Sequence, residues 1–192
     1  METVDVTKPR CPWCNLKNPI YVAYHDEEWG VPCHDEHKLY ELFILETFQA
    51  GLSWECILNK RENFRKAYDG FQLDKVCRYG DAKIAELLQD SGIIRNRAKI
   101  DASISNSRIY QDILKKFGGF GEYLKQFTEG KTRIEPDIQV TTNEWSDRLS
   151  KDLKKRGMKF VGSTTMYAFL QAIGIVQAHT KDCYLYQKNK RT

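Results

Sequence analysis

Metal-binding residue types at both ends of the chain are the feature that most constrains the fold. Cys11 and His25 lie near the start of the 192 residues, and His179 and Cys183 lie near the end. A spacing of four lets His179 and Cys183 share one helix face or a tight turn, and both residue types ligate zinc. One metal held by all four residues would close the chain end to end, with no coordination position left for a reacting water. The pattern therefore indicates a structural metal site whose loss would loosen both ends.

The first ligand has an alternative reading in the sequence. Cys11 and Cys14 form a C-x-x-C pair, so Cys14 could replace Cys11 or the two could be a redox motif. The redox reading is weakened because no βαβ pattern surrounds the pair. We expect the other cysteines to be buried thiols and the other histidines to lie on the surface: Cys33, Cys56, Cys77, His34 and His37.

Size and charge narrow the class of protein. A chain of 192 residues with 41% hydrophobic content predicts one domain, residues 1–192, with a substantial core. The formal charge of +4 fits an anionic partner without demonstrating one. No run approaches the roughly 18 apolar residues of a membrane span, and residues 1–10 lack the apolar segment of a signal peptide. We expect a cytoplasmic protein with no membrane partner.

An acidic residue interrupts the first clear helical pattern. Leu39, Leu42 and Phe43 follow helical spacing and predict a helix that begins near Asp35. The next position on this apolar face is Glu46. A carboxylate there is costly to desolvate, so either a neighbouring arginine pairs with it or the residue serves the function.

Glycine and serine mark the next boundaries. Gly51 is expected to end this helix, leaving Leu52 at a turn, and Ser53 can cap a helix that carries Trp54 to Phe64. Further helices are predicted through Ile84 to Gly92, through Ile100 to a stop at Gly118 and Gly119, and over Phe120 to Phe127. Residues 129–143 are predicted to be a connecting loop. With few strand-like alternations, the class is all-α.

Two helices near the end of the chain have the shape of a helix-hairpin-helix. The first carries Trp145 to Leu153 and can end at Gly157, and Ser163 can cap the second. Gly162 lacks a side chain, so backbone N–H groups at the start of the second helix could approach a phosphate closely. Five basic residues crowd this region: Lys151, Lys154, Lys155, Arg156 and Lys159. An ordinary helical hairpin with a solvated lysine face would have the same pattern.

Five sequence blocks occur in an order that resembles the family of 3-methyladenine DNA glycosylase I, a base-excision repair enzyme of the helix-hairpin-helix superfamily. The blocks are residues 21–32, Glu46 with residues 49–54, residues 92–97, residues 154–162, and His179 with Cys183. The resemblance implies a two-lobed all-α fold, with a helical lobe including residues 35–128 and a helix-hairpin-helix and zinc-closing segment at 145–185. It also implies one structural Zn²⁺ per chain, bound by Cys11, His25, His179 and Cys183, with Cys11 preferred to Cys14 because Trp13 follows it.

The resemblance implies hydrolysis of the N-glycosidic bond of 3-methyladenine, and of 3-methylguanine weakly, in alkylated double-stranded DNA. The flipped base would bind among Tyr21, Tyr24, Glu46 and Trp54. Glu46 would accept a hydrogen bond from the exocyclic amine and favour the cationic lesion, while the aromatic rings stack on the base. Leu52 is the candidate wedge, against a plain core leucine as the alternative, and the hairpin contacts to DNA would come from Lys159, Gly162 and Ser163.

Residues after the hairpin bear on the reaction type. Superfamily members that also cut the backbone carry a lysine just after the hairpin glycine, whereas Gly162 is followed here by Ser163 and two threonines. We therefore predict a monofunctional, monomeric glycosylase without lyase activity. Asp182 lies near the position of a superfamily aspartate, but it is expected to be a solvated residue of the zinc loop. The alternative function is a non-catalytic, zinc-stabilised helix-hairpin-helix module that only binds DNA.

Overall fold

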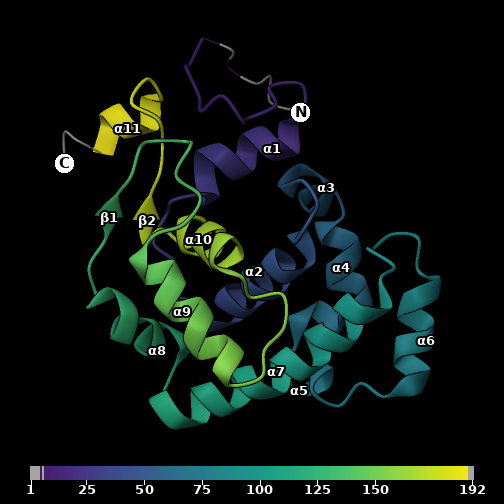
Figure 1. Cartoon of the computed structure of the whole chain (residues 1–192). Helices are drawn as coiled ribbons and strands as arrows, with labels where there is room; N and C mark the ends of the chain where they lie inside the picture. The colour runs from purple at the N-terminus through teal and green to yellow at the C-terminus, as the bar shows by residue number, and fades with distance from the viewer. Residues whose placement is uncertain (1–4, 6, 190–192) are drawn as a thin grey trace.

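The computed structural model describes residue 5 and residues 7–189, and it consists of helices and one pair of very short strands (Figure 1). The predicted all-α class is confirmed, apart from these strands. The terminal residues of the predicted 1–192 domain, namely 1–4, 6 and 190–192, lie outside the described residues. Within the described part of the chain, no helix combines the length and apolar content needed to cross a membrane.

The elements follow one another along the chain as short and long helices around a central one. The first half contains α1 (Pro19–Ala23), the π-helix η1 (Tyr24–Glu28), α2 (Glu36–Gln49), α3 (Trp54–Asn59), α4 (Arg61–Ala67), the 3-10 helix η2 (Asp69–Phe71), α5 (Leu73–Val76) and α6 (Asp81–Gln89). The second half contains α7 (Arg97–Phe117), α8 (Phe120–Thr128), β1 (Arg133–Ile134), α9 (Glu144–Lys155), α10 (Ser163–Ala172), β2 (Val176–Gln177) and α11 (Tyr184–Asn189).

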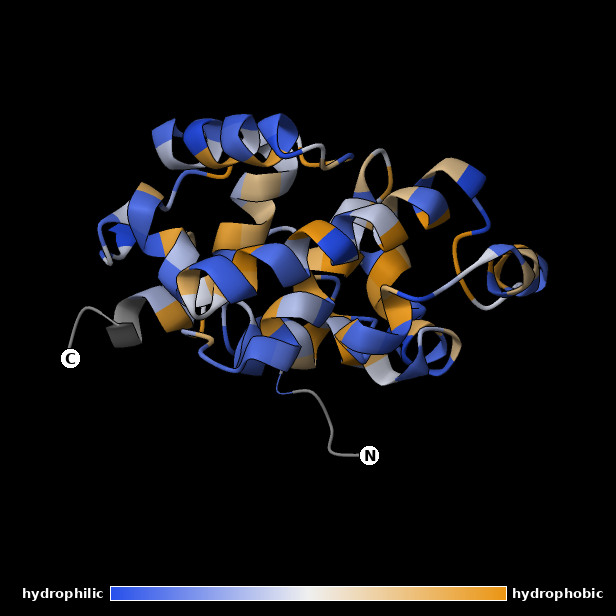
Figure 2. Cartoon of the chain, turned by 90° about the horizontal axis from the view of Figure 1, so that it is seen from below, coloured by the Kyte–Doolittle hydropathy of each residue, from blue (hydrophilic) through white to orange (hydrophobic). Residues whose placement is uncertain are grey.

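Helix α2 is the centre of the core. All residues from Leu39 to Phe48 are buried, and α2 packs against α3, α7, α8 and α10. A helix that is buried on every side must be surrounded by other elements, as Figure 1 shows for α2. In Figure 2, hydrophobic residues gather between the helices and hydrophilic residues face outward. The buried position of α2 places Glu46 inside the protein.

Several predicted helix boundaries are confirmed, and two in the first half of the chain are wrong. Asp35 caps α2 by accepting from the Lys38 amide, Ser53 caps α3 in the same way, and α7 stops at Gly118, whose φ is 80°. The helix expected from Trp54 to Phe64 is in fact two helices, divided at Lys60. The helix expected to reach Gly92 ends at Gln89, because Asp90 already has extended backbone angles.

The predicted loop at 129–143 contains a strand. Arg133 and Ile134 of β1 pair in parallel with Val176 and Gln177 of β2. The Arg133 amide donates to the Ile175 carbonyl at 3.0 Å, which ties the loop to the segment that leads into His179. Two-residue strands are too short to show an alternating pattern, so the prediction missed them.

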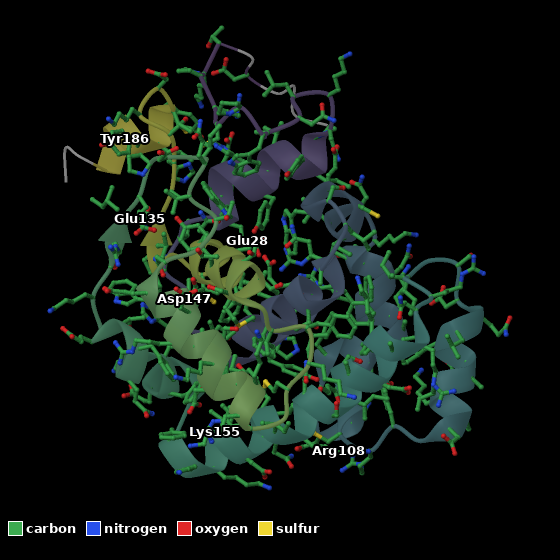
Figure 3. The ribbon with its side chains drawn as sticks, in the orientation of Figure 1. Glu28, Arg108, Glu135, Asp147, Lys155 and Tyr186 are labelled. Carbon is green, nitrogen blue, oxygen red and sulfur yellow. The ribbon has the colours of Figure 1, made fainter. Side chains whose placement is uncertain are left out.

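Helices α9 and α10 form the predicted hairpin, joined by residues 156–162, which we call the hairpin turn. Gly157 has a φ of 97°, which favours glycine. The prediction that Ser163 caps α10 is wrong, because Gly162 is the N-cap and Ser163 is the first helical residue. The Ser163 hydroxyl instead donates to Asp147 of α9, which is labelled in Figure 3.

Candidate functional site

A small cavity next to α2 brings together aromatic rings and one carboxylate. Its volume is about 160 Å³, which is room for about five waters or one small ring system. The four residues predicted to form a base pocket all line it: Tyr21, Tyr24, Glu46 and Trp54. Further lining residues were not predicted as part of the pocket: Trp13, Trp29, Gln49, Ala168 and Gln171.

Local sequence explains how the tyrosines reach the cavity. Asn18 caps α1 by accepting from the Ile20 amide, and Pro19 occupies the first helical position, where its missing N–H does no harm. The chain then continues into η1 without a break, so Tyr21 and Tyr24 belong to one continuous helical stretch. A spacing of three places both side chains on one face.

Glu46 is a buried and unpaired acid. It is only 2% exposed, and its Oε2 has no hydrogen-bond partner among the described residues. Desolvation raises the pKa of Glu46 to about 8. The arginine pairing considered from the sequence is instead found at Glu41, which binds Arg61 and Arg65. A buried acceptor without a donor is costly, so this pocket suits a ligand that brings a donor or a positive charge.

Aromatic rings form most of the cavity wall. The centroids of Tyr24 and Trp54 are 5.3 Å apart, and those of Trp13 and Tyr21 are also 5.3 Å apart. Trp29 packs edge-on against Trp13 at 4.7 Å. The Trp54 indole N–H has no acceptor in the described part of the chain. These ring faces suit a flat ligand, and more so a cationic one.

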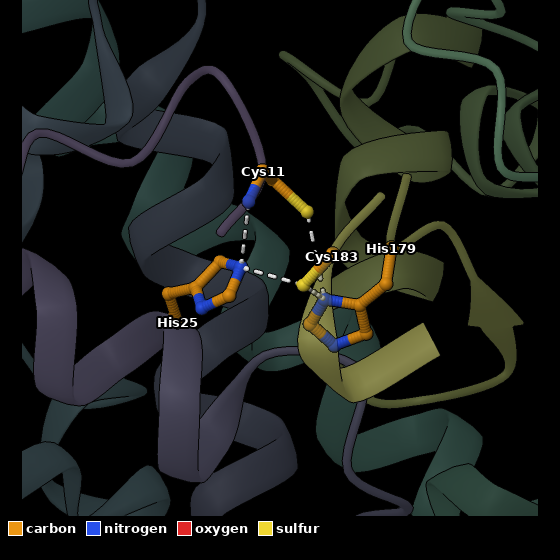
Figure 4. A group of neighbouring side chains, drawn as sticks. All are labelled: Cys11, His25, His179 and Cys183. Carbon is orange, nitrogen blue, oxygen red and sulfur yellow. Dashed lines mark hydrogen bonds between the residues drawn. The ribbon is translucent and has the colours of Figure 1, made fainter. Parts of the chain in front are cut away.

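The predicted metal ligands meet behind this wall (Figure 4). The ligand atoms of Cys11, His25, His179 and Cys183 all lie within 4.8 Å of one another, and all four residues are buried. Three sulfur–nitrogen separations are 3.6 Å. Tetrahedral zinc with ordinary Zn–S and Zn–N bonds separates a sulfur from a nitrogen by about 3.6 Å. The residues therefore fit a metal ion.

Other groups orient His25 toward the thiols. Its Nδ1 lies 2.8 Å from Asp26 Oδ1, and Arg10 pairs with the same carboxylate at 2.7 Å. This leaves Nε2 to face Cys183. Carboxylates commonly hold metal-binding histidines in this way. Hydrogen bonds from Cys11 and from the two imidazoles lower the pKa of Cys183, which favours the thiolate that a metal needs.

Cys11, and not Cys14, belongs to this group. Cys14 is buried, but its thiol points to the Tyr21 carbonyl at 4.0 Å. His34 and His37 are exposed, as expected. The expectation of buried thiols is wrong for three cysteines, which are half-buried: Cys33, Cys56 and Cys77.

We call the four residues that fit a metal ion the metal-binding group: Cys11, His25, His179 and Cys183. This group and the cavity share a wall. The Trp13 ring is 5.1 Å from His25, and the Trp29 ring is 4.7 Å from His179, measured between centroids. Both tryptophans also line the cavity. Trp13 could have been noticed as the aromatic residue inside the Cys11–Cys14 pair, whereas its contact with His25 depends on tertiary structure.

The residues predicted to touch DNA lie at or near the surface. Leu52 is 40% exposed, which argues against the core alternative. Lys159 is exposed, and Asn106 bonds both its amide and its carbonyl at 2.9 Å. Gly162 has open space where a Cβ would be. Asp182 is exposed, as expected of a solvated loop residue. The DNA contacts themselves stay predictions.

The helical fold and its hairpin define a protein of the helix-hairpin-helix DNA glycosylase class. The model of the methyladenine glycosylase family matches residues 13–186, and the chain belongs to that family. DNA-3-methyladenine glycosylase 1 of Escherichia coli (strain K12) is 43% identical over 185 residues, which cover 94% of this chain and 98% of the relative.

Solved structures agree with this assignment. A crystal structure of 3-methyladenine DNA glycosylase I superposes with a TM-score of 0.87 at 42% identity, covering 92% of this chain and 98% of the other. A variant of 3-methyladenine DNA glycosylase I in complex with 3-methyladenine gives a TM-score of 0.83 at 35% identity, covering 88% of this chain and 92% of the other.

Proposed function

We propose that this protein is a monofunctional DNA glycosylase that flips 3-methyladenine out of alkylated double-stranded DNA and hydrolyses its N-glycosidic bond. The observation that carries the proposal is the unpaired carboxylate of Glu46 in a pocket walled by aromatic rings. The relative in complex with 3-methyladenine supports the same ligand. A damaged base must leave the duplex to reach a buried pocket of this kind.

Charge would discriminate the lesion from normal adenine. Methylation at N3 gives the base in DNA a positive charge, whereas adenine is neutral. In a pocket shielded from water, the Glu46 carboxylate attracts the cation and accepts a hydrogen bond from the exocyclic amine, while Tyr24 and Trp54 stack on the ring. We assign Glu46 as the catalytic residue that contacts the base.

The chemical step asks little of the protein. A water oxygen bonds to C1′ of the sugar, the bond from C1′ to the base breaks, and its electron pair neutralises the positive charge of the base. The water proton goes to solvent. The positions after Gly162 are Ser163, Thr164 and Thr165, so no amine there can form a Schiff base, and the product would be an abasic site with an intact backbone.

The metal has a structural role in this proposal. Two thiols and two imidazoles are the usual donors of a structural Zn²⁺, and we expect one per chain. When bound, the zinc supplies no reacting group; it joins the segments that carry His25 and His179. The residues of the pocket then perform the recognition.

DNA contacts are assigned to two surface features. Leu52 would fill the space that the flipped base leaves in the stack. Lys159, Gly162 and Ser163 would meet a phosphate at the start of α10. Gly162 has a φ of −61°, which any residue adopts, and a Cβ there would touch nothing within the protein. The fold therefore does not require a glycine at this position. The glycine is explained if a DNA phosphate must approach the backbone here.

Chromatography of bases released from methylated DNA tests the proposal, with normal adenine as the internal control. We expect release of 3-methyladenine and no adenine. Glu46→Gln should lower release by about 100-fold or more while leaving duplex binding nearly unchanged. The proposal fails if the folded, metal-loaded protein leaves alkylated DNA unchanged.

The same assay addresses the alternative of a non-catalytic DNA-binding module. Such a module needs neither Glu46 nor the aromatic pocket. It would be supported if Tyr24→Ala, Trp54→Ala and Glu46→Gln bound duplex DNA normally and neither they nor the unaltered protein released a base. Borohydride trapping separately tests the predicted absence of lyase chemistry: a covalent complex with DNA would overturn it.

A further inference from the structure

Lys99 is a buried lysine that follows closely on residues 92–97, a block that carries the family resemblance. It lies in the first turn of α7 and is 8% exposed. Its ammonium donates to the Phe48 carbonyl at 2.7 Å and to the Ala50 carbonyl at 2.6 Å. These carbonyls are at the end of α2, where a helix leaves its last carbonyls without internal partners and favours a positive charge.

The two carbonyls belong to residues four and two positions before the exposed Leu52. Gly51 has a φ of 78°, and the Leu52 amide donates to the Gln49 carbonyl at 2.6 Å, so residues 49–53 form a tight turn, which we call the Leu52 turn. The side chain of Lys99 joins the start of this turn to α7. The other end of the turn is held by Ser53, the N-cap of α3.

The other side of Lys99 faces the hairpin turn. Its ammonium lies 5.9 Å from the centroid of the Phe160 ring. Phe160 has a φ of 57°, unusual for a residue with a large side chain, so its ring position depends on surrounding contacts. Two turns further along α7, Asn106 bonds both backbone groups of Lys159. One face of α7 thus holds both the Leu52 turn and the hairpin turn.

Packing alone does not explain a charge at this position. Burial lowers the pKa of Lys99, and no carboxylate of the described residues offsets this. A methionine would fill similar space without the desolvation penalty. Unlike a methionine, the ammonium donates hydrogen bonds, and its acceptors are the carbonyls that precede Leu52.

We propose that Lys99 is a positioning residue that sets the Leu52 turn at a fixed place relative to the hairpin turn, so that both engage one DNA duplex together. This inference rests on the proposed function, in which the Leu52 turn and the hairpin turn both contact DNA. Loss of the ammonium leaves the hairpin and the pocket residues Tyr24 and Glu46 in place but lets the Leu52 turn move. The variant would then bind DNA but insert Leu52 poorly into the base stack.

Fluorescence of 2-aminopurine tests this without relying on base release. The probe is placed in a duplex beside an abasic-site analogue, where insertion of Leu52 would unstack it. Lys99→Met should bind this duplex within about threefold of the unaltered protein, yet give less than about half of its rise in fluorescence. Lys99→Arg should restore the rise, because a guanidinium can also donate to both carbonyls. Lys115→Met, an exposed lysine on the same helix, is the matched control and should behave normally.

Two further measurements separate positioning from general damage. Affinity for free 3-methyladenine, followed by tryptophan fluorescence, should stay within about twofold in Lys99→Met. Phe160→Leu removes the ring contact and keeps the ammonium, so it provides a second folded variant, expected to show a reduced rise.

A rise in Lys99→Met equal to that of the unaltered protein overturns the inference, as does an equal loss of free-base affinity. If the unaltered protein releases no base, the proposed function fails, and the fluorescence comparison still decides the role of Lys99.

Discussion

Tyr24 and His25 are consecutive residues of η1, and their rings reach different sites. The Tyr24 ring lies 5.3 Å from Trp54 in the cavity, and His25 Nε2 lies 3.6 Å from Cys183 Sγ in the metal-binding group. A π-helix is a rare, wide turn that often occurs at functional sites. Because adjacent residues share one backbone, a shift of His25 moves Tyr24.

Loss of the metal should therefore damage base binding before DNA binding. Cys183→Ser, or removal of the metal by a chelator, should lower the melting temperature by several degrees and weaken affinity for 3-methyladenine about tenfold. Nonspecific duplex affinity should change less, because none of the four metal-binding residues belongs to the hairpin turn. Cys77→Ser, at a half-buried thiol outside the group, is the control. Unchanged stability of Cys183→Ser would exclude a metal that ties the chain ends together.

A buried ion network fixes the other end of η1. Arg61 donates to Glu28 Oε2 at 2.9 Å and to Glu41 Oε1 at 2.5 Å, and Figure 3 labels Glu28. Arg61→Met leaves Glu41 with Arg65 at 2.8 Å and the half-buried Glu28 with Lys38 at 3.7 Å, so we expect a loss of about 1–3 kcal/mol in the free energy of unfolding. Urea denaturation measures it. Arg97→Met, which removes an exposed pair with Asp101, should cost at most about 1 kcal/mol. Similar losses in both variants would contradict the assignment.

Glu46 should make the protein less stable at alkaline pH. Its folded pKa of about 8 lies above the ordinary value of 4.5. Between these values the folded protein retains a proton that the unfolded chain has released, so the free energy of unfolding falls as the pH rises and the loss is complete above about 8. Glu46→Gln should be more stable than the unaltered protein by about 2–5 kcal/mol near pH 9. The difference should shrink toward pH 5, and a constant difference would show that Glu46 does not titrate in this range.

Gly162 should matter for DNA and not for folding. Gly162→Ala adds a methyl group in open space at the N-cap of α10, so the melting temperature should change by less than about two degrees. Duplex affinity should fall about tenfold, because the methyl group meets the phosphate. Gly80 is an N-cap glycine of α6 with the same open surroundings, so Gly80→Ala is a matched control that should leave DNA binding unchanged. Equal duplex affinity of the two variants would remove the hairpin from the DNA interface.

Helix boundaries were predictable from the sequence where a single residue determines the local geometry. Asp35 and Ser53 cap their helices as expected, and Gly118 ends α7 in the left-handed conformation that the stop requires. The break at Lys60 was missed because neither glycine nor proline marks it. Ser163 was assigned the wrong role because Gly162 takes the cap position and leaves the hydroxyl free for Asp147.

The site was predictable only in part. Glu46 stood out because an acid on an apolar helix face is physically costly, and the structure indeed leaves it unpaired. The cysteine and histidine pattern predicted the metal ligands, with Cys14 as an alternative to Cys11. The family resemblance supplied the tyrosines and the preference for Cys11. Trp29 and Gln171 line the same cavity, but they come from segments far apart in the chain. Local patterns cannot reveal such contacts, since they depend on how α10 packs against α2.

The pH dependence of base release tests most directly whether Glu46 recognises the lesion by charge. The ratio kcat/KM, measured for base release from methylated duplex DNA, reports the protonation state of the free protein. This ratio should rise about tenfold per pH unit between about pH 6 and 8 and then level off, because only the carboxylate form of Glu46 attracts the cation. Glu46→Gln should release the base slowly and without this rise. A flat profile for the unaltered protein, or the same rise in Glu46→Gln, would contradict the account.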